Sequence, residues 1–152
     1  MVRTNIHFLY ILVLGAVGCT APAADSPLQT DTQVQSIYWS DGDSGRIDGM
    51  KFRLSDIDAP ETGGVGAAIG GAKCEKEREL GFEAKEFVVE MTRDARLEIT
   101  TSYGLDKYDR EVIDLSANGV DVGQAGVEAG VLGDWPHKGR RALSKKPDWC
   151  EG

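Results

Sequence analysis

The chain has 152 residues, enough for one domain of ordinary size with a hydrophobic core. Its hydrophobic content of 41% and charged content of 28% are typical of a soluble globular protein. A net charge of −8 and a pI near 4.7 argue against a protein that coats nucleic acid nonspecifically, but they do not exclude an enzyme with a locally basic or metal-loaded site.

The first residues have the pattern of a secretory signal. Arg3 precedes an apolar run at residues 6–17 that is too short to span a bilayer. Two cleavage patterns stay open. Residues 16–19 resemble a bacterial lipobox, which would leave a lipidated Cys19 at the mature N-terminus, whereas residues 21–23 fit ordinary signal cleavage.

This pattern predicts three regions and an exported protein. After the signal, the composition is that of a disordered tether, and no second domain follows the first. The predicted regions are a secretory signal at residues 1–19, a tether at residues 20–32 and one folded domain at residues 33–152. We expect either a periplasmic or cell-envelope lipoprotein, attached to the membrane through Cys19, or a secreted protein.

Cysteine parity supports export. Lipidation or removal of Cys19 leaves Cys74 and Cys150, which we expect to pair as a disulfide in an oxidising compartment. Closing a loop of that size stabilises the fold by about 4–5 kcal/mol in the chain-entropy model. The alternative, two unpaired buried thiols, is uncommon in a secreted chain.

Hydrophobic periodicity predicts a strand-rich domain with two helices. Apolar residues alternate in several short segments and recur with helical spacing in two longer ones. The predicted strands cover residues 33–40, 45–49, 50–57, 95–102 and 110–115, the predicted helices cover residues 75–92 and 120–129 with Gly130 as C-cap, and a Gly-rich loop covers residues 62–72. The predicted fold class is mainly β with α (α+β), built as a small closed or partly closed barrel.

The residue inventory disfavours three common types of site. The Gly-rich loop does not match a phosphate-binding loop, because Lys73 comes one position late and Cys74 stands where Ser or Thr belongs. His137 is the only histidine after the signal segment and has no serine elbow near it, which disfavours a nucleophilic triad. One histidine and two cysteines that are expected to pair cannot complete a structural zinc site.

Basic side chains crowd the C-terminal tail. They are Lys138, Arg140, Arg141, Lys145 and Lys146. Two interpretations stay open, a solvated surface run, which is the more usual, and a patch that contacts phosphate.

Residues 41–61 (DGDSGRIDGMKFRLSDIDAPE) concentrate the chemistry of the chain. Asp43 and Asp58 lie at the ends of two neighbouring predicted strands, so their carboxylates can converge on one hard cation, for which Ca²⁺ is the best candidate. Arg53 adds a partner for an anion, and Glu61 adds a spare carboxylate. Turn-capping roles explain each aspartate alone, but not their occurrence together with the arginine. The combination is typical of phosphoryl-transfer sites.

Four motifs follow one another in a fixed order along the chain. They are Asp41-Gly42-Asp43-Ser44, Arg53-Leu54, Ile57-Asp58-Ala59-Pro60-Glu61 and Lys107-Tyr108-x-Arg110. In this spaced combination the sequence resembles the thermonuclease (staphylococcal nuclease-like) family over roughly residues 34–131. The resemblance implies a five-stranded OB-fold β-barrel with flanking helices. It also implies Ca²⁺-dependent hydrolysis of phosphodiester bonds in DNA and RNA.

The resemblance further implies a role for the matched acidic residues. Asp43 and Asp58 would bind Ca²⁺, together with the backbone carbonyl of Ala59. Glu61 would act as the general base, or orient the attacking water.

Basic and aromatic residues would bind the substrate in the same comparison. Arg53 and Arg110 would hold the scissile phosphate and stabilise the charge that builds on it. Lys107 and Tyr108 match positions that contact the terminal phosphate of the nucleotide. In family members the 5′ oxygen is the leaving group, which gives 3′-phosphate ends.

Two positions depart from the family pattern. Asp109 replaces the glycine usual before Arg110, which places a negative charge beside that arginine or in solvent. Ala59 replaces a threonine found in some members, which is tolerated if only its carbonyl binds the metal.

The sequence therefore predicts an exported Ca²⁺-dependent nuclease that acts on DNA and RNA as a monomer without an obligate protein partner. The alternative is a non-catalytic OB-fold binding module on a lipid tether. A structural Ca²⁺ domain would use the carboxylates but has no use for the arginines.

Overall fold

The computed structural model of the protein describes residues 34–151. The predicted signal at residues 1–19, the tether at residues 20–32 and the lipidation site Cys19 lie outside this range. Between residues 34 and 151, no helix combines the length and the apolar character needed to cross a membrane.

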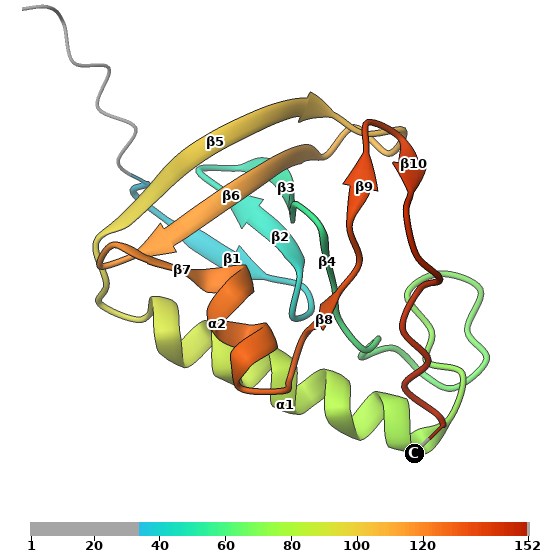
Figure 1. Cartoon of the computed structure of the whole chain (residues 1–152). Coiled ribbons are helices and arrows are strands. Elements are labelled where there is room, and N and C mark those ends of the chain that lie inside the picture. The colour runs from blue at the N-terminus through green and yellow to red at the C-terminus, as the bar shows by residue number, and fades with distance from the viewer. Residues whose placement is uncertain (1–33, 152) are drawn as a thin grey trace, which may run out of the picture. The chain divides into compact units, whose positions relative to one another are not determined.

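Six strands form the main sheet (Figure 1). Their bounds are β1 Ile37–Trp39, β2 Ser44–Ile47, β3 Met50–Leu54, β5 Leu97–Leu105, β6 Glu111–Ala117 and β7 Val120–Asp121. The neighbour order is β1-β2-β3-β6-β5, and β7 pairs with β6. β3 and β6 run parallel, with Arg53 opposite Val112, whereas β1–β2, β2–β3, β5–β6 and β6–β7 pair antiparallel. The parallel pair brings two chain segments that carry predicted site residues side by side.

Two small antiparallel pairs extend the fold beyond the sheet. β4 Ile57–Asp58 pairs with β8 Gly133–Asp134, and β9 His137–Lys138 pairs with β10 Arg141–Ala142. The first pair places Asp58 opposite Gly133. The C-terminal segment that follows Gly133 therefore leaves the sheet next to Asp58, a predicted metal ligand.

Two helices pack below the sheet in the view of Figure 1. α1 is Glu75–Thr92, capped by the Cys74 sulfur, which accepts the Glu77 N–H at 3.4 Å. α2 is Val122–Glu128, capped by Asp121, whose carboxylate accepts the Gln124 N–H. Each cap satisfies one of the N–H groups that the first helical turn leaves unpaired.

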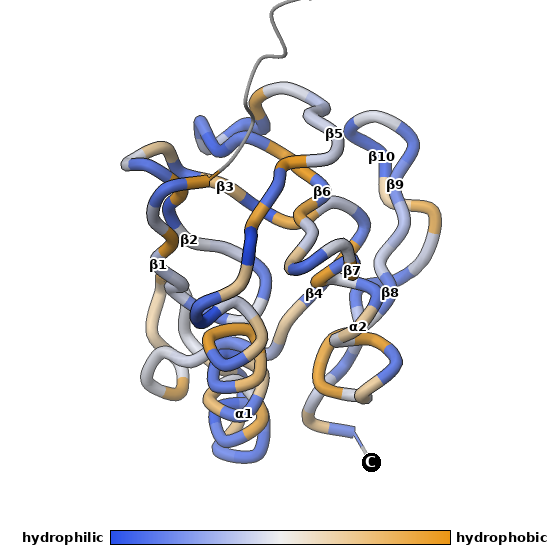
Figure 2. The backbone as a smooth tube through the Cα atoms, turned by 90° about the vertical axis from the view of Figure 1, so that its left-hand side faces the viewer, coloured by the Kyte–Doolittle hydropathy of each residue, from blue (hydrophilic) through white to orange (hydrophobic). Residues whose placement is uncertain are grey.

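The hydrophobic core lies between α1, α2 and the sheet, where apolar positions on the two layers face each other (Figure 2). Its members are Trp39, Ile47, Phe52, Leu54, Ile57, Ala59, Ala84, Val88, Leu97, Ile113, Leu115, Ala117, Val122 and Leu132. Trp39 and Phe52 meet edge to face, with ring centroids 5.0 Å apart, and the Trp39 indole N–H bonds to Thr92 Oγ1 at 3.0 Å. The indole polar group is therefore satisfied inside the core.

Two glycines let α1 approach the loops that carry the predicted site. A Cβ on Gly81 would lie 2.6 Å from the Glu61 carbonyl oxygen, and a Cβ on Gly42 would lie 2.8 Å from Ala84 Cβ. These distances are too short for any side chain, so the helix backs directly onto both acidic segments.

The sheet is not closed into a barrel. Its path ends at β1 on one side and at β5 on the other. A backbone hydrogen bond of 3.2 Å from Val34 N–H to the Leu97 carbonyl crosses this gap, but β1 and β5 do not form a ladder. The α+β class and the strand-rich character are confirmed, whereas the five-stranded barrel is not shown.

Several predicted elements differ in extent. The strand predicted at residues 50–57 breaks into β3 and β4, because Asp56 turns the chain with a φ of 54°. The second helix starts at Val122 and not at residue 120, because Val120 and Asp121 pair with β6. Phe82 belongs to the first helix but is 50% exposed, so this apolar side chain does not join the core. The C-cap of the second helix is Ala129 and not Gly130, because the helix ends at Glu128; Gly130 is the next residue and has a φ of 75°.

Candidate active site

Asp43 is held in a tight turn between β1 and β2. The Asp41 carboxylate accepts the backbone N–H of Asp43 at 3.1 Å and that of Ser44 at 2.8 Å. In turn, Asp43 Oδ2 accepts the Ala59 N–H at 3.2 Å, and the Asp43 carbonyl accepts the Leu54 N–H at 2.8 Å. The two acidic segments predicted from the sequence are thus joined directly to each other.

The Asp43 carboxyl is strongly perturbed. Burial raises its pKa from 3.8 to about 8, the neighbouring Asp41 and Asp58 carboxylates raise it as well, and only Arg53 lowers it. A buried carboxyl with this balance gains the most from a nearby cation, because a cation favours its ionised form.

Arg53 projects from β3 and is fixed on three sides. Its Nη2 atom donates to the Ile57 carbonyl at 2.9 Å and lies 3.8 Å from Asp43 Oδ2. Its Cζ atom lies 5.1 Å from the centroid of the Trp135 ring. Only 15% of the side chain is exposed, so these contacts hold the guanidinium in one place.

The C-terminal tail reaches Asp58 and Glu61. The Lys146 ammonium lies 3.2 Å from Asp58 Oδ1 and 3.6 Å from Glu61 Oε1. Trp149 donates its indole N–H to Asp58 Oδ2 at 3.0 Å. Both oxygens of the buried Asp58 carboxylate therefore have a partner from the tail.

The pKa values of Glu61 and of Lys146 are both raised. Burial raises the pKa of Glu61, and Lys146 only partly offsets this. Burial lowers the pKa of Lys146, but Asp58 and Glu61 raise it on balance. The lysine therefore stays an ammonium at neutral pH.

Arg110 lies at the start of β6 but apart from this cluster. Its Nε and Nη2 atoms donate to Asp106 Oδ2 at 2.9 Å and 2.7 Å. Its Cζ atom lies 5.4 Å from the centroid of the Tyr108 ring. Within residues 34–151, no ion pair joins Arg110 to Asp43, Asp58 or Glu61. Arg110 nevertheless lies near Arg53 in the sheet. It directly precedes Glu111, the first residue of β6, which pairs with Phe52 beside Arg53.

The turn before Arg110 explains two further positions. Asp109 is exposed and has a φ of 59°, the region that favours glycine, and the carboxylate that pairs with Arg110 belongs to Asp106. Burial raises the pKa of Asp106, but hydrogen bonds from Arg110 and Tyr108 lower it on balance. Lys107 and Tyr108 are exposed in this turn, and the Lys107 ammonium lies 4.8 Å from the centroid of the Tyr108 ring.

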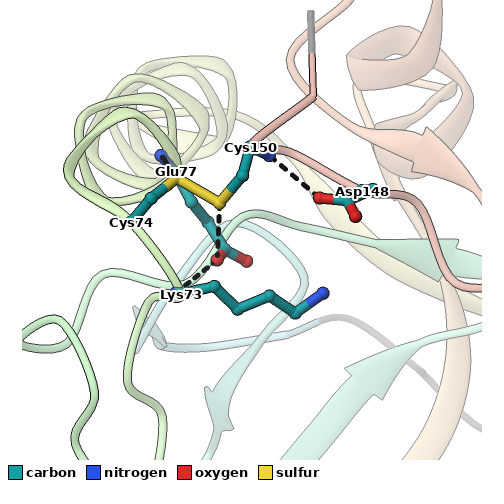
Figure 3. The surroundings of a disulfide bond; sticks show 5 residues. All are labelled: Lys73, Cys74, Glu77, Asp148 and Cys150. Atoms are coloured by element: carbon teal, nitrogen blue, oxygen red, sulfur yellow. Dashed lines mark hydrogen bonds between the residues drawn. A yellow bond between two sulfur atoms is a disulfide. The ribbon is translucent and has the colours of Figure 1, made fainter.

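The predicted disulfide joins Cys74 and Cys150, with Cα atoms 6.1 Å apart (Figure 3). Next to it, the Glu77 carboxylate accepts the Lys73 N–H at 2.6 Å, and Asp148 accepts the Cys150 N–H at 3.1 Å. The disulfide fixes the end of the tail to the start of α1.

The donor set suits a hard cation. In the described range, no group of three or more His, Cys, Asp or Glu side chains is placed to hold a metal ion. The expected ligands are instead the carboxylates of Asp43 and Asp58 with the Ala59 carbonyl, which leaves further positions to water or substrate oxygens. Oxygen donors of this kind fit Ca²⁺, and the ammonium between Asp58 and Glu61 shows that this place accepts positive charge.

A cavity of about 370 Å³ lies elsewhere, at the far end of β6. Its lining residues are Arg96, Glu98, Ser116, Asn118 and Gly119. It holds none of the predicted site residues, so it does not mark the acidic cluster.

Sequence reasoning missed three residues that contact the site, which are Asp106, Trp135 and Trp149. Lys146 of the basic tail pairs with the acidic cluster, which neither interpretation of the tail predicts. The expected disulfide could have indicated that the tail reaches the site. A bond between Cys74 and Cys150 places residues near position 150 next to the segment that follows Glu61.

One comparison with known protein families supports the resemblance. Residues 51–135 match the model of the family described as staphylococcal nuclease homologue. The comparison with curated proteins gave no match. Because the matched range is more than half of the 152 residues and contains Arg53, Asp58, Glu61 and Arg110, the chain belongs to the staphylococcal nuclease homologue family.

Proposed function

We propose that the protein is a Ca²⁺-dependent nuclease that hydrolyses phosphodiester bonds of DNA and RNA outside the cytoplasm. Family membership supports a nuclease-type hydrolase. The observation that carries the proposal is the Arg53 guanidinium, held against the Ile57 carbonyl next to the buried carboxylate of Asp43. A domain that used carboxylates only to bind Ca²⁺ for stability would have no need of this arginine.

Asp43, Asp58 and the Ala59 carbonyl would hold the metal ion. When bound, Ca²⁺ would neutralise phosphate charge and position the attacking water. The buried position of Asp58 and the hydrogen bond from Ala59 N–H to Asp43 keep these ligands in place before substrate arrives.

Glu61 accepts the proton of the attacking water. Because its pKa is raised by burial, its carboxylate is a stronger base than an exposed glutamate. The water oxygen bonds to phosphorus, the bond from phosphorus to the 5′ oxygen breaks, and the leaving oxygen takes a proton from solvent. The products are a 3′-phosphate and a 5′-hydroxyl.

The two arginines bind the phosphate. Arg53 is ready in the free protein, because its guanidinium is already fixed. Arg110 would exchange its contact with Asp106 for a phosphate oxygen, and its position one residue before the β3–β6 pairing supports this role, because β3 carries Arg53. The exposed Lys107 and Tyr108 would contact a terminal phosphate.

The fold and the location complete the proposal. The strand order β1-β2-β3-β6-β5 is compatible with a partly open, five-stranded OB-fold barrel. A disulfide is typical of an oxidising compartment, which supports export, with attachment to the membrane if Cys19 is lipidated. The protein would act as a monomer.

Digestion of DNA and RNA in Ca²⁺ and in EDTA tests the function, with wild type compared with Glu61→Ala. We expect activity in wild type with Ca²⁺ and a loss of at least ~10²-fold in the variant. Glu83→Ala, which removes an exposed carboxylate of α1, is the matched control and should keep full activity. Equal, metal-independent inactivity in all three proteins would favour the non-catalytic binding module.

Mass analysis of the mature N-terminus tests the membrane attachment separately. An acylated Cys19 supports the lipoprotein, and an unmodified Ala24 supports ordinary cleavage.

A further inference from the structure

The ammonium of Lys146 occupies a position where positive charge is needed. Within residues 34–151, it is the basic side chain that pairs with both Asp58 and Glu61. Arg53 pairs with Asp43, the third carboxylate of the cluster. Each of these three carboxylates thus has an internal cation as a partner.

Residues 146–150, here called the C-terminal strap, hold this ammonium in place. The strap packs against Gly133, where an added Cβ would lie 2.8 Å from Pro147 Cγ and 3.2 Å from Trp149 Cζ2. Its end is joined to α1 by the disulfide between Cys150 and Cys74 (Figure 3). The strap lies outside the range that matches the family model, which ends at residue 135.

The strap is therefore anchored at its end, next to the acidic cluster. Trp149 bonds to Asp58 at 3.0 Å, and the disulfide lies four residues after Lys146 in the chain. Such a short tether gives the ammonium a high effective concentration at Asp58 and Glu61. A divalent ion that binds Asp58 must displace an ammonium that cannot diffuse away.

We propose that Lys146 is an internal cation that competes with the divalent metal ion for the Asp58 carboxylate, so that the disulfide-linked strap sets the metal affinity of the site. This inference rests on the proposed function, because it takes the cluster to be the Ca²⁺ site. It goes further by assigning a competing role to residues outside the family-matched range.

Calorimetric titration with Ca²⁺ alone tests the proposal without an activity assay. Lys146→Met keeps the length of the side chain and removes the charge, and we expect it to bind Ca²⁺ about tenfold more tightly than wild type. Lys145→Met is the matched control, because Lys145 is exposed and lies next in the chain. Its affinity should equal that of wild type.

The melting temperature provides a second measurement on the same proteins. In EDTA, Lys146→Met should melt below wild type, because Asp58 loses the partner of its buried charge. Saturating Ca²⁺ should raise the melting temperature of this variant more than that of wild type. Equal shifts in the two proteins would overturn the competition.

Removing the tether tests the role of the strap. The double variant Cys74→Ala/Cys150→Ala should bind Ca²⁺ more tightly than wild type but no more tightly than Lys146→Met. Wild-type affinity in the double variant would show that the disulfide does not hold the ammonium at the site.

The outcomes separate this inference from the proposed function. If Ca²⁺ binds wild type and Lys146→Met equally, the inference is wrong and the metal site stands. If Ca²⁺ binds none of the variants, including Lys146→Met, both the metal site and the inference fail.

Discussion

Trp149 donates its indole N–H to Asp58 Oδ2 at 3.0 Å, although 91 positions separate the two residues in the sequence. Asp58 is buried, with only 2% of its surface exposed, so this donor and the Lys146 ammonium replace the water that its oxygens would otherwise bind. Trp149, in the C-terminal tail, thus helps to orient the carboxylate of Asp58, a predicted metal ligand.

Trp149→Phe should keep the packing of the ring and remove the donor. The free energy of unfolding is expected to fall by about 1–3 kcal/mol, because a buried carboxylate loses a hydrogen bond. Urea denaturation in EDTA measures this. Trp135→Phe is the control, because its indole N–H bonds only to the neutral Ser144 carbonyl, at 3.3 Å. A loss as large in Trp135→Phe would contradict the special role of the bond to Asp58.

Arg53→Lys should lower the rate of DNA cleavage by at least ~10²-fold at saturating Ca²⁺, because an ammonium lacks the planar fork with which a guanidinium binds two phosphate oxygens while it stays on the Ile57 carbonyl. Initial rates on a defined duplex measure this. Arg46→Lys provides the control, since Arg46 is exposed on the neighbouring strand and bonds to the Gly49 carbonyl. Retained activity in Arg53→Lys would refute the phosphate-binding role.

The stability of the metal-free protein should fall as the pH rises. The folded-state pKa of Asp43 is about 8 against an ordinary value of 3.8, so the folded state binds more protons than the unfolded state between these values. The contribution of Asp43 to the free energy of unfolding is therefore fully present below pH 3.8 and is lost as the pH rises to about 8.

Urea midpoints in EDTA across this range check the effect. Asp43→Asn should flatten the slope, and a smaller slope of the same sign should remain from Glu61, whose pKa is also raised. Ca²⁺ should flatten the slope in wild type, because a bound cation favours the ionised carboxylate. An unchanged slope in Asp43→Asn would exclude Asp43 as its source.

Gly81→Ala should disturb the site from behind. The new Cβ would lie 2.6 Å from the Glu61 carbonyl oxygen and 2.8 Å from that of Pro60, and neither backbone atom can move without shifting the loop. We expect a loss of about 1–3 kcal/mol in the free energy of unfolding and reduced cleavage. Gly64→Ala, in a position with no atom within 4 Å, is the control and should unfold like wild type.

Local pattern was enough to predict much of the fold. The first helix was predicted with both boundaries correct, since residues 75–92 combine a clear apolar period with a cap at Cys74. The second helix was predicted too long, because Val120 and Asp121 pair with a strand that local periodicity cannot see. Closure of the sheet was likewise beyond local pattern, because it depends on whether β1 and β5 meet.

The candidate site divides in the same way. Asp43, Arg53 and Asp58 come from one short segment, so motif spacing alone placed them together, and the structure joins that segment through Asp43 and Ala59. Lys146 was one of several tail lysines with no distinguishing local pattern. Its position follows from contacts between segments far apart in the chain, which no local rule encodes.

The disulfide between Cys74 and Cys150 also defines the smallest polypeptide that can carry the site with its native contacts. A fragment cut at residue 135, where the family match ends, would leave one cysteine single, Gly133 uncovered and Asp58 without its donors from the tail. For expression and domain exchange, the C-terminal boundary that keeps these contacts is therefore Cys150 and not the end of the family match.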